Sequence, residues 1–284
     1  MEQTSPHHPL SGRDNKAIRT LASLADPKGR RKEKAYLVEG VKMVEEALRD
    51  RAGVRQVIAS PSLTQHHGKG VISLAGQQGI PILWISARLM DQIAESKTPQ
   101  PVMAVVEMRE YPEDRLIDHR AQLIVLAHQL QDPGNLGTII RTVEAAGASG
   151  VAVTPNTVDP CNAKSVRASM GSILRVPVVR ITDANGFLGA CRAKGFQTAA
   201  LVLNGGETHF DLDLRRPTVI VLGQEGSGLE ETLLPDDVRR VRIPMADTID
   251  SLNVATSAAV ILYEAMRQRQ GGRSPHATRC AGND

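Results

Sequence analysis

The stretch LIVLAHQLQDPGNLGTIIRTVEAAGASG, residues 123–150, decides the fold of this chain. It begins with the apolar run 123–127, which has the length and residue types of a buried parallel strand. The sequence Asp-Pro-Gly at 132–134 then interrupts the pattern. The apolar spacing that follows predicts a helix, which Asn135 caps and which ends near Gly147. A second apolar strand comes directly after it, so the stretch predicts a βαβ unit.

The polar loop HQLQDPGN, residues 128–135, lies at the carboxyl end of the first predicted strand, where open α/β sheets bind their ligands. Two later segments have the same layout. An apolar strand at 218–222 runs into the glycine-rich segment 223–228, and a strand at 241–243 precedes Ser-Leu-Asn-Val at 251–254, where a long helix begins. Because three strand ends deliver small or amide-bearing residues, we expect them to form one site.

Composition describes a soluble protein of two domains. The chain has 284 residues, of which 41% are hydrophobic and 23% are charged. No apolar run reaches the length of a membrane span, and the polar start does not resemble a signal peptide. The three cysteines are widely spaced, which predicts free thiols in a reducing cytoplasm. The histidines and cysteines do not cluster, so we expect no metal site.

Positive charge is concentrated near the amino terminus. Residues 13–34 contain eight lysines and arginines against three acidic residues, an excess of 8 − 3 = +5, although the whole chain carries only +3. This distribution predicts contact with a polyanion, and Arg30, Arg31 and Lys32 are the candidate RNA-binding residues. The alternative is a solvated leader without a partner. Aromatic residues make up only 2% of the chain. We therefore expect RNA to be recognised through its phosphates, ribose groups and shape rather than by stacking of its bases.

Five regions follow from the pattern: a disordered leader (1–12), a compact α/β sandwich (13–108), a charged linker (109–120), a parallel α/β domain (121–270) and a flexible tail (271–284). In the sandwich we expect helices at 15–25, 41–48, 71–77 and 87–94, a turn at 27–32, and strands at 36–38, 54–59, 81–84 and 102–106. In the second domain we further expect helices at 163–171, 184–194 and 252–269, and strands at 176–180 and 197–203.

Three motifs appear in order along the second domain. They are Asn135-Leu136-Gly137 with Arg141, the segment LGQEGSGL at 222–229, and Ile243-Pro244-Met245 followed by SLNVA at 251–255. Together they resemble the signature motifs of the SpoU/TrmH branch of the SPOUT RNA methyltransferases. The stretch 31–46 also resembles the amino-terminal substrate-binding domain common in that family, which is similar to ribosomal protein L30e.

The resemblance implies a carboxyl-terminal domain with a trefoil knot, S-adenosylmethionine as cofactor, a homodimer, and methylation of a ribose 2′-hydroxyl in RNA. It assigns the catalytic residues Asn135, Arg141, Glu225, Ser251 and Asn253. It places the cofactor against Leu203, Gly223, Ile243, Met245 and Leu252. It implies rRNA or tRNA as substrate. The separate amino-terminal domain favours rRNA, and 23S rRNA is the expected target. The alternatives are tRNA, an antibiotic-resistance role on rRNA, or a weakly active RNA-binding homologue. This sequence lacks the glycine-rich fingerprint of a dinucleotide-dependent oxidoreductase, so that class of enzyme is not favoured.

Each site residue also has a simpler interpretation. Asn135, Ser251 and Asn253 could only cap helices, the glycines could only form a turn, Glu225 could be a solvated carboxylate, and Arg141 could lie on a solvated helix face. Two positions depart from the family pattern. Asp247 stands where glycine is common, and Ala255 replaces a serine. For a dimer, Val260, Ile261 and Met266 of the final helix are the expected interface positions.

Overall fold

The computed structural model describes residues 4–12, 15–64, 68–96, 98–118, 122–226, 228–233, 235 and 237–270. The chain forms two compact units. Unit 1 consists of Met1–Glu110, Leu136–Arg141 and Val158–Arg175, and unit 2 consists of Tyr111–Asn135, Thr142–Thr157 and Val176–Asp284. The predicted tail, 271–284, lies outside the described residues, and the predicted division at 109–120 remains a prediction.

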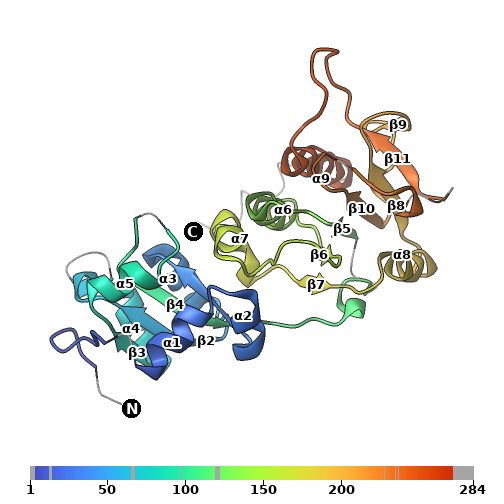
Figure 1. The fold of residues 1–284 in the computed structure, drawn as a ribbon. Helices are drawn as coiled ribbons and strands as arrows, with labels where there is room; N and C mark the ends of the chain where they lie inside the picture. The colour runs from blue at the N-terminus through green and yellow to red at the C-terminus, as the bar shows by residue number, and fades with distance from the viewer. Residues whose placement is uncertain are drawn as a thin grey trace, which may run out of the picture. The chain divides into compact units, whose positions relative to one another are not determined.

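Unit 1 is built on a four-stranded sheet in the order β1-β4-β2-β3 (Figure 1). The strands are β1 (Ala35–Glu39), β2 (Val54–Ala59), β3 (Ile82–Trp84) and β4 (Val102–Glu107). The helices are α1 (Lys16–Ser23), α2 (Pro27–Glu33), α3 (Val41–Arg49), α4 (Lys69–Gln77) and α5 (Ala87–Ile93), with a 3-10 turn at Pro61–Thr64. Alternate residues of β4 serve two cores. Met103 and Val105 pack with α1 and α5, whereas Val102 and Ala104 pack with α3 and α4. The expected α/β sandwich is therefore present.

Two predictions at the amino terminus were wrong. The leader was expected to be disordered, but Leu10 donates its N–H to the Trp84 carbonyl at 2.9 Å and so lies along the edge strand β3. The segment at 27–32 was expected to be a turn, but it is helix α2. Pro27 suits the first position of a helix because its missing N–H has no partner there.

Residues 158–175, which we call the bridging segment, pack into the core of unit 1. The segment contains α7 (Ala163–Ala168) and a 3-10 turn at Ser172–Leu174. Val166 and Leu174 are buried among residues of α3, β1 and β4. Arg175 pairs with Asp50 at 2.6 Å. The segment thus covers β1, an edge strand whose backbone groups would otherwise lack a neighbour on that side.

Unit 2 contains a seven-stranded, wholly parallel sheet in the order β7-β6-β5-β10-β8-β11-β9. Its strands are β5 (Leu123–Ala127), β6 (Gly150–Val153), β7 (Val178–Arg180), β8 (Gln197–Leu201), β9 (Glu207–Thr208), β10 (Thr218–Leu222) and β11 (Arg239–Arg242). The chain builds outward from β5 to β7 and then returns to the other side of β5. The sheet therefore has a topological switch point between β5 and β10, and the predicted parallel α/β class is confirmed.

Helices α8 (Ala184–Ala193) and α9 (Val254–Gln270) cover this sheet, with short 3-10 turns at Glu113–Arg115 and Glu231–Leu233. Phe187 and Leu188 of α8 pack on one face, and Figure 1 shows α9 on the side away from α8. The stretch predicted as a charged linker carries Leu116, which is fully buried in the same core as α8. No helix in the described part of the chain is long and apolar enough to span a membrane.

Candidate functional site

The loop after β5 places Asn135 inside a helix rather than at its cap. Helix α6 (Pro133–Ala145) begins one residue after Asp132, whose side chain accepts the N–H of Asn135 at 2.9 Å. The prediction that Asn135 caps this helix was therefore wrong, because Asp132 performs that role. Since the cap is already supplied, the amide of Asn135 is available for other bonds. The predicted end of the helix at Gly147 is confirmed by its left-handed backbone, with φ +67°.

Glu225 fixes the amide of Asn135. Asn135 donates from Nδ2 to Glu225 Oε1 at 2.8 Å, and the backbone N–H of Gln131 donates to Glu225 Oε2 at 3.1 Å. Burial acts to raise the pKa of this carboxyl group, but the hydrogen bonds from Asn135 and from the backbone outweigh it and lower the pKa. Glu225 is therefore an ionised carboxylate whose two oxygens are engaged. It is suited to hold a partner in place rather than to accept a proton.

Asn253 joins the same network and also caps a helix. Its Oδ1 accepts the backbone N–H groups of Ala255 and Thr256 at 2.9 and 3.3 Å, at the start of α9. Its Nδ2 donates to Asn135 Oδ1 at 2.9 Å. The orientation of each amide is thus determined by its neighbours, since each amide nitrogen meets an acceptor and each amide oxygen meets a donor. The predicted cap role of Asn253 is confirmed, and its catalytic role stays a prediction. Ser251 is exposed and makes no hydrogen bond with described residues, so its role remains a prediction.

Two residues of the site were missed by sequence reasoning. Gln131 donates from Nε2 to the carbonyls of Gln129 and Asn156 at 2.7 and 2.8 Å, which ties the loops after β5 and β6 together. Gln129 has a left-handed backbone, with φ 54°, and donates to Glu230 at 3.2 Å. The available signal was the run HQLQ directly after a buried strand, in which three of the four residues are polar.

The sheet brings the network and the predicted cofactor residues to one edge. Because the strands are parallel, the residues after β5, β8, β10 and β11 all lie at the carboxyl edge. In this order β8 separates β10 from β11. Leu203 follows β8, Gly223 follows β10, and Ile243 and Met245 follow β11. Leu252 precedes α9.

The predicted cofactor residues at this edge are apolar side chains and a glycine, residue types that suit a flat adenosine and an apolar methionine chain. Leu203 is 53% exposed, while Ile243, Met245 and Leu252 are half-buried. At Gly223 a Cβ atom would lie 2.4 Å from the Gly228 carbonyl oxygen, so only glycine allows the loop to close on itself. The residues present therefore fit S-adenosylmethionine, which supplies an electrophilic methyl group when bound.

The two departures from the family pattern have simple local explanations. Asp247 is exposed and is not among the residues with left-handed backbone, so this loop does not require glycine there. Ala255 is 5% exposed and gives its N–H to the Asn253 cap. Its side chain belongs to the buried face of α9.

The predicted basic residues separate into two kinds. Arg31 and Lys32 are exposed on α2, as a phosphate contact requires. Arg30 is 1% exposed and its guanidinium is occupied by Asp159 and by two backbone carbonyls, so its assignment as an RNA contact is not supported.

Arg141 is exposed on α6 and makes no hydrogen bond or ion pair with described residues. Ile261, expected at a dimer interface, is fully buried within its own chain.

Comparison with known proteins agrees with this geometry. Residues 122–263 match the SpoU rRNA Methylase family, and residues 15–104 match the MRM3-like substrate binding domain. The chain is 30% identical to the 23S rRNA (guanosine(2553)-2′-O)-methyltransferase RlmP of Bacillus subtilis, over 88% of this chain and 95% of that protein.

Two crystal structures with AdoMet, S-adenosylmethionine, are also similar. They are an rRNA methyltransferase from Sinorhizobium meliloti and the SpoU methyltransferase AviRb from Streptomyces viridochromogenes, each with a TM-score of 0.80, 31% identity and 91% coverage of this chain. The matches cover 97% and 100% of those chains. The fold and site thus define an RNA methyltransferase that uses S-adenosylmethionine. The chain belongs to the SpoU rRNA Methylase family.

No group of three or more histidine, cysteine, aspartate or glutamate side chains within the described ranges is arranged to hold a metal ion.

His128 supplies a pH-dependent contribution to stability. It is 7% exposed at the end of β5, and neither ring nitrogen has a hydrogen-bond partner among the described residues. Burial lowers the pKa of His128 below its usual value, although nearby Glu230 acts to raise it. A histidine with a lowered folded-state pKa binds fewer protons folded than unfolded. Stability should therefore be lost as pH falls through about 6.5, the usual pKa of histidine.

We expect the urea midpoint of the protein to fall between pH 7.5 and pH 5.5, and His128→Leu to reduce this fall, because leucine takes up no proton. His7→Leu, which changes an exposed histidine, serves as the matched control and should keep the wild-type dependence. An equal fall of the urea midpoint with pH in wild type and His128→Leu would contradict the assignment of this pH dependence to His128.

Proposed function

We propose that this protein methylates the 2′-hydroxyl of a ribose in 23S rRNA. The observation that carries the proposal is the chain of hydrogen bonds from Asn253 through Asn135 to the ionised Glu225, at the switch point of the sheet. Its members are amides held rigidly by a carboxylate, which suits binding a polar group in one orientation. The named 23S rRNA 2′-O-methyltransferase with near-full-length similarity supports the same target.

In this proposal Arg141 prepares the nucleotide. A guanidinium keeps its proton at accessible pH and is a poor base, but it binds a phosphate with two parallel hydrogen bonds. The side chain is exposed and unpaired among the described residues, so it is available for that contact. It stabilises the negative charge that develops on the attacking 2′-oxygen, and phosphate or water accepts the proton.

Ser251 lies two residues before Asn253 and is proposed to contact the reacting nucleotide. The proposed assembly is a cytoplasmic homodimer whose cofactor lies in a trefoil knot. Val260 and Met266 support the dimer because they remain half-buried on α9 after the chain has folded. The mass in solution at micromolar concentration tests this assembly, and a monomer would count against it.

The function is tested by transfer of tritium from labelled S-adenosylmethionine to RNA, followed by mapping of 2′-O-methyl positions in cells with and without the gene. The proposal expects one ribose of 23S rRNA to lose its methyl group when the gene is removed. A methyl group missing from tRNA instead would establish the alternative substrate. Cofactor binding by calorimetry without transfer to any RNA would indicate a binding protein and overturn the proposal.

The exposed residues of α2 are proposed to bind RNA phosphates. Neutralising Arg31 and Lys32 together should weaken RNA binding and flatten its dependence on salt by about 1.5 units of log–log slope, since each lost phosphate contact removes roughly 0.7–0.9. A filter-binding series from 50 to 300 mM salt measures this. The matched control is Arg215→Ala with Arg216→Ala, an equal charge change at exposed positions of unit 2. Identical slopes for wild type and the α2 variant would exclude the contact.

A further inference from the structure

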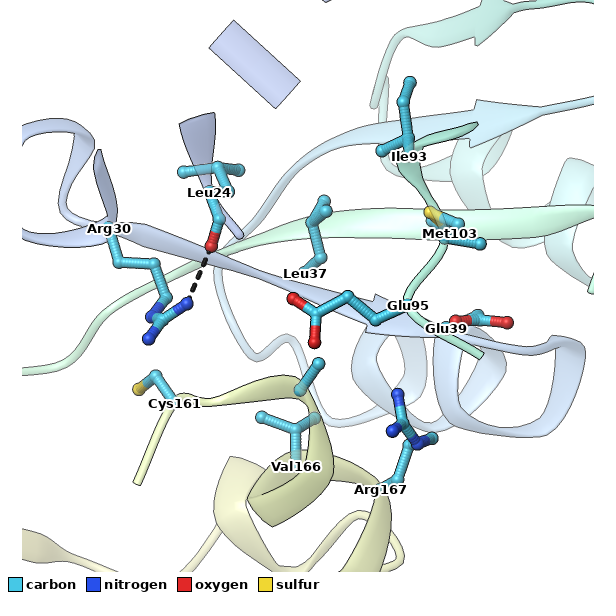
Figure 2. A pocket seen from close by; sticks show the side chains of 12 residues that line it. Leu24, Arg30, Leu37, Glu39, Ile93, Glu95, Met103, Cys161, Val166 and Arg167 are labelled. Carbon is cyan, nitrogen blue, oxygen red and sulfur yellow. Dashed lines mark hydrogen bonds between the residues drawn. The ribbon is translucent and has the colours of Figure 1, made fainter. Parts of the chain in front are cut away.

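Arg30 forms a buried ion pair with Asp159 of the bridging segment. Its Nε and Nη2 donate to Asp159 Oδ2 at 2.8 and 2.7 Å. Its Nη1 donates to the carbonyls of Leu24 and Ala25, both at 2.8 Å, where α1 ends. Figure 2 shows the guanidinium of Arg30 beside Cys161, with its bond to Leu24. One side chain therefore joins α1, α2 and the loop before α7.

Asp159 in turn fixes the start of α7. Its Oδ1 accepts the backbone N–H of Cys161 at 3.1 Å. Its carbonyl accepts the backbone N–H of Asn162 at 2.9 Å and the hydroxyl of Ser165 at 3.3 Å. The carboxylate that receives Arg30 thus belongs to the turn before α7, a helix capped by Asn162, so the pair ties this turn to α1 and α2.

Helix α7 then contacts α6 at Gly137 with no space between the backbones. A Cβ atom at Gly137 would lie 2.3 Å from the Ser165 carbonyl oxygen and 2.7 Å from the Ala168 Cβ. Arg141 comes four residues after Gly137, one turn further along the same helix face. The position of α7 therefore determines the position of the helix turn that carries Arg141.

Packing beside the ion pair is incomplete, which makes the pair more important for holding α7. A cavity of about 20 Å³, room for one water molecule, lies there. Figure 2 shows Arg167 of α7 on one side and Glu39 and Glu95 on the other. The Nη1 atom of Arg167 is buried and has no hydrogen-bond partner within the described part of the chain. Apolar packing alone therefore does not determine the direction of α7 at this point.

We propose that Arg30 and Asp159 are positioning residues for Arg141. The pair holds α7, α7 holds α6 through Gly137, and α6 presents Arg141. Arg31 and Lys32 lie on the same short helix, α2, as Arg30. RNA phosphates bound by Arg31 and Lys32 therefore contact the helix whose Arg30 positions Arg141 through α7 and α6. The inference rests on the proposed function only for the role of Arg141 in methyl transfer. The physical linkage itself is independent of it.

Arg30→Lys tests the linkage with the charge retained and the forked geometry lost. We expect kcat to fall about tenfold or more, because a small displacement of a catalytic group has effects of this order. The KM for RNA and the Kd for S-adenosylmethionine should remain unchanged. Hydrogen exchange should increase around Arg30 at the ends of α1 and α2, and also in residues 136–141 and 158–175. A wild-type kcat with wild-type exchange in these residues would overturn the proposal.

Arg30→Met with Asp159→Leu separates positioning from stability. Replacing both members of a buried pair with apolar residues usually preserves folding, whereas removing one leaves an unpaired charge. The proposal expects a folded double variant with low kcat, and a wild-type kcat would overturn it. If Arg30→Lys does not fold, the kcat of the double variant still decides whether the pair positions Arg141.

The matched control is Arg55→Lys. This exposed arginine of β2 also bonds two carbonyls and a carboxylate, those of Glu33, Lys34 and Glu107, but has no link to α7. It should keep wild-type kcat and exchange. If the wild-type protein methylates no RNA, the proposed function fails while the exchange experiment still decides the linkage. Unchanged hydrogen exchange at residues 136–141 in a folded Arg30→Lys protein would then refute the linkage between Arg30 and α6.

Discussion

Asn135→Asp is expected to lower single-turnover methyl transfer at pH 8 by about 100-fold or more, the range found when one hydrogen-bond donor is removed from a catalytic site. The wild-type amide donates to Glu225 at 2.8 Å. An aspartate there sets two carboxylates against each other, and two such groups in contact do not both ionise readily. At high pH repulsion opens the network, and Asn253 loses the orientation of its acceptor.

The loss should be smaller at acidic pH. When the aspartate takes up a proton, its hydroxyl donates to Glu225 as the amide did, so the geometry returns. The ratio of variant to wild-type rate should therefore rise as pH falls from 8 to 5.5. A small loss at pH 8, or a loss that does not change with pH, would contradict the assigned network.

The control for Asn135→Asp is Asn185→Asp. Asn185 is exposed in the first turn of α8, where a negative charge is tolerated near the helix start. It has no bond to the network, so its rate should remain near that of wild type at every pH. This comparison separates the effect of the local carboxylate pair from that of one added charge.

Arg141→Lys is expected to lower turnover by about 100-fold. Lysine keeps the positive charge but loses the planar fork that binds a phosphate through two bonds. Because Arg141 is exposed and unpaired among described residues, the change should not affect folding or the Kd for S-adenosylmethionine. Turnover at saturating RNA and calorimetry of cofactor binding measure the two properties separately.

Arg192→Lys is the matched control for Arg141. Its guanidinium pairs with Asp237 on the exposed surface of unit 2, and an exposed ion pair contributes little to stability. We expect turnover near wild type. If Arg141→Lys behaved in the same way, Arg141 would be a surface residue without a role in the reaction.

The sequence by itself determined the class of the fold and pointed to most residues of the candidate site, but not to Gln129 and Gln131. Runs such as 123–127 and 218–222 are apolar throughout because both faces of a parallel strand are covered, so their identity as buried strands could be predicted from composition alone. The motifs identified Asn135, Glu225 and Asn253. The three prove to be hydrogen-bonded although up to 118 positions separate them in sequence.

Only the tertiary structure decided which partner each of these residues has. Asp132 rather than Asn135 caps α6, because a cap is chosen by backbone geometry that neighbouring polar residues can satisfy equally well. The insertion of β8 between β10 and β11 follows from strand pairing across the sheet, which no local pattern encodes. Positive charge in sequence indicated an RNA contact at Arg30, yet burial makes Arg30 a structural residue. Its acceptor Asp159 lies 129 positions away and is brought to it only by folding.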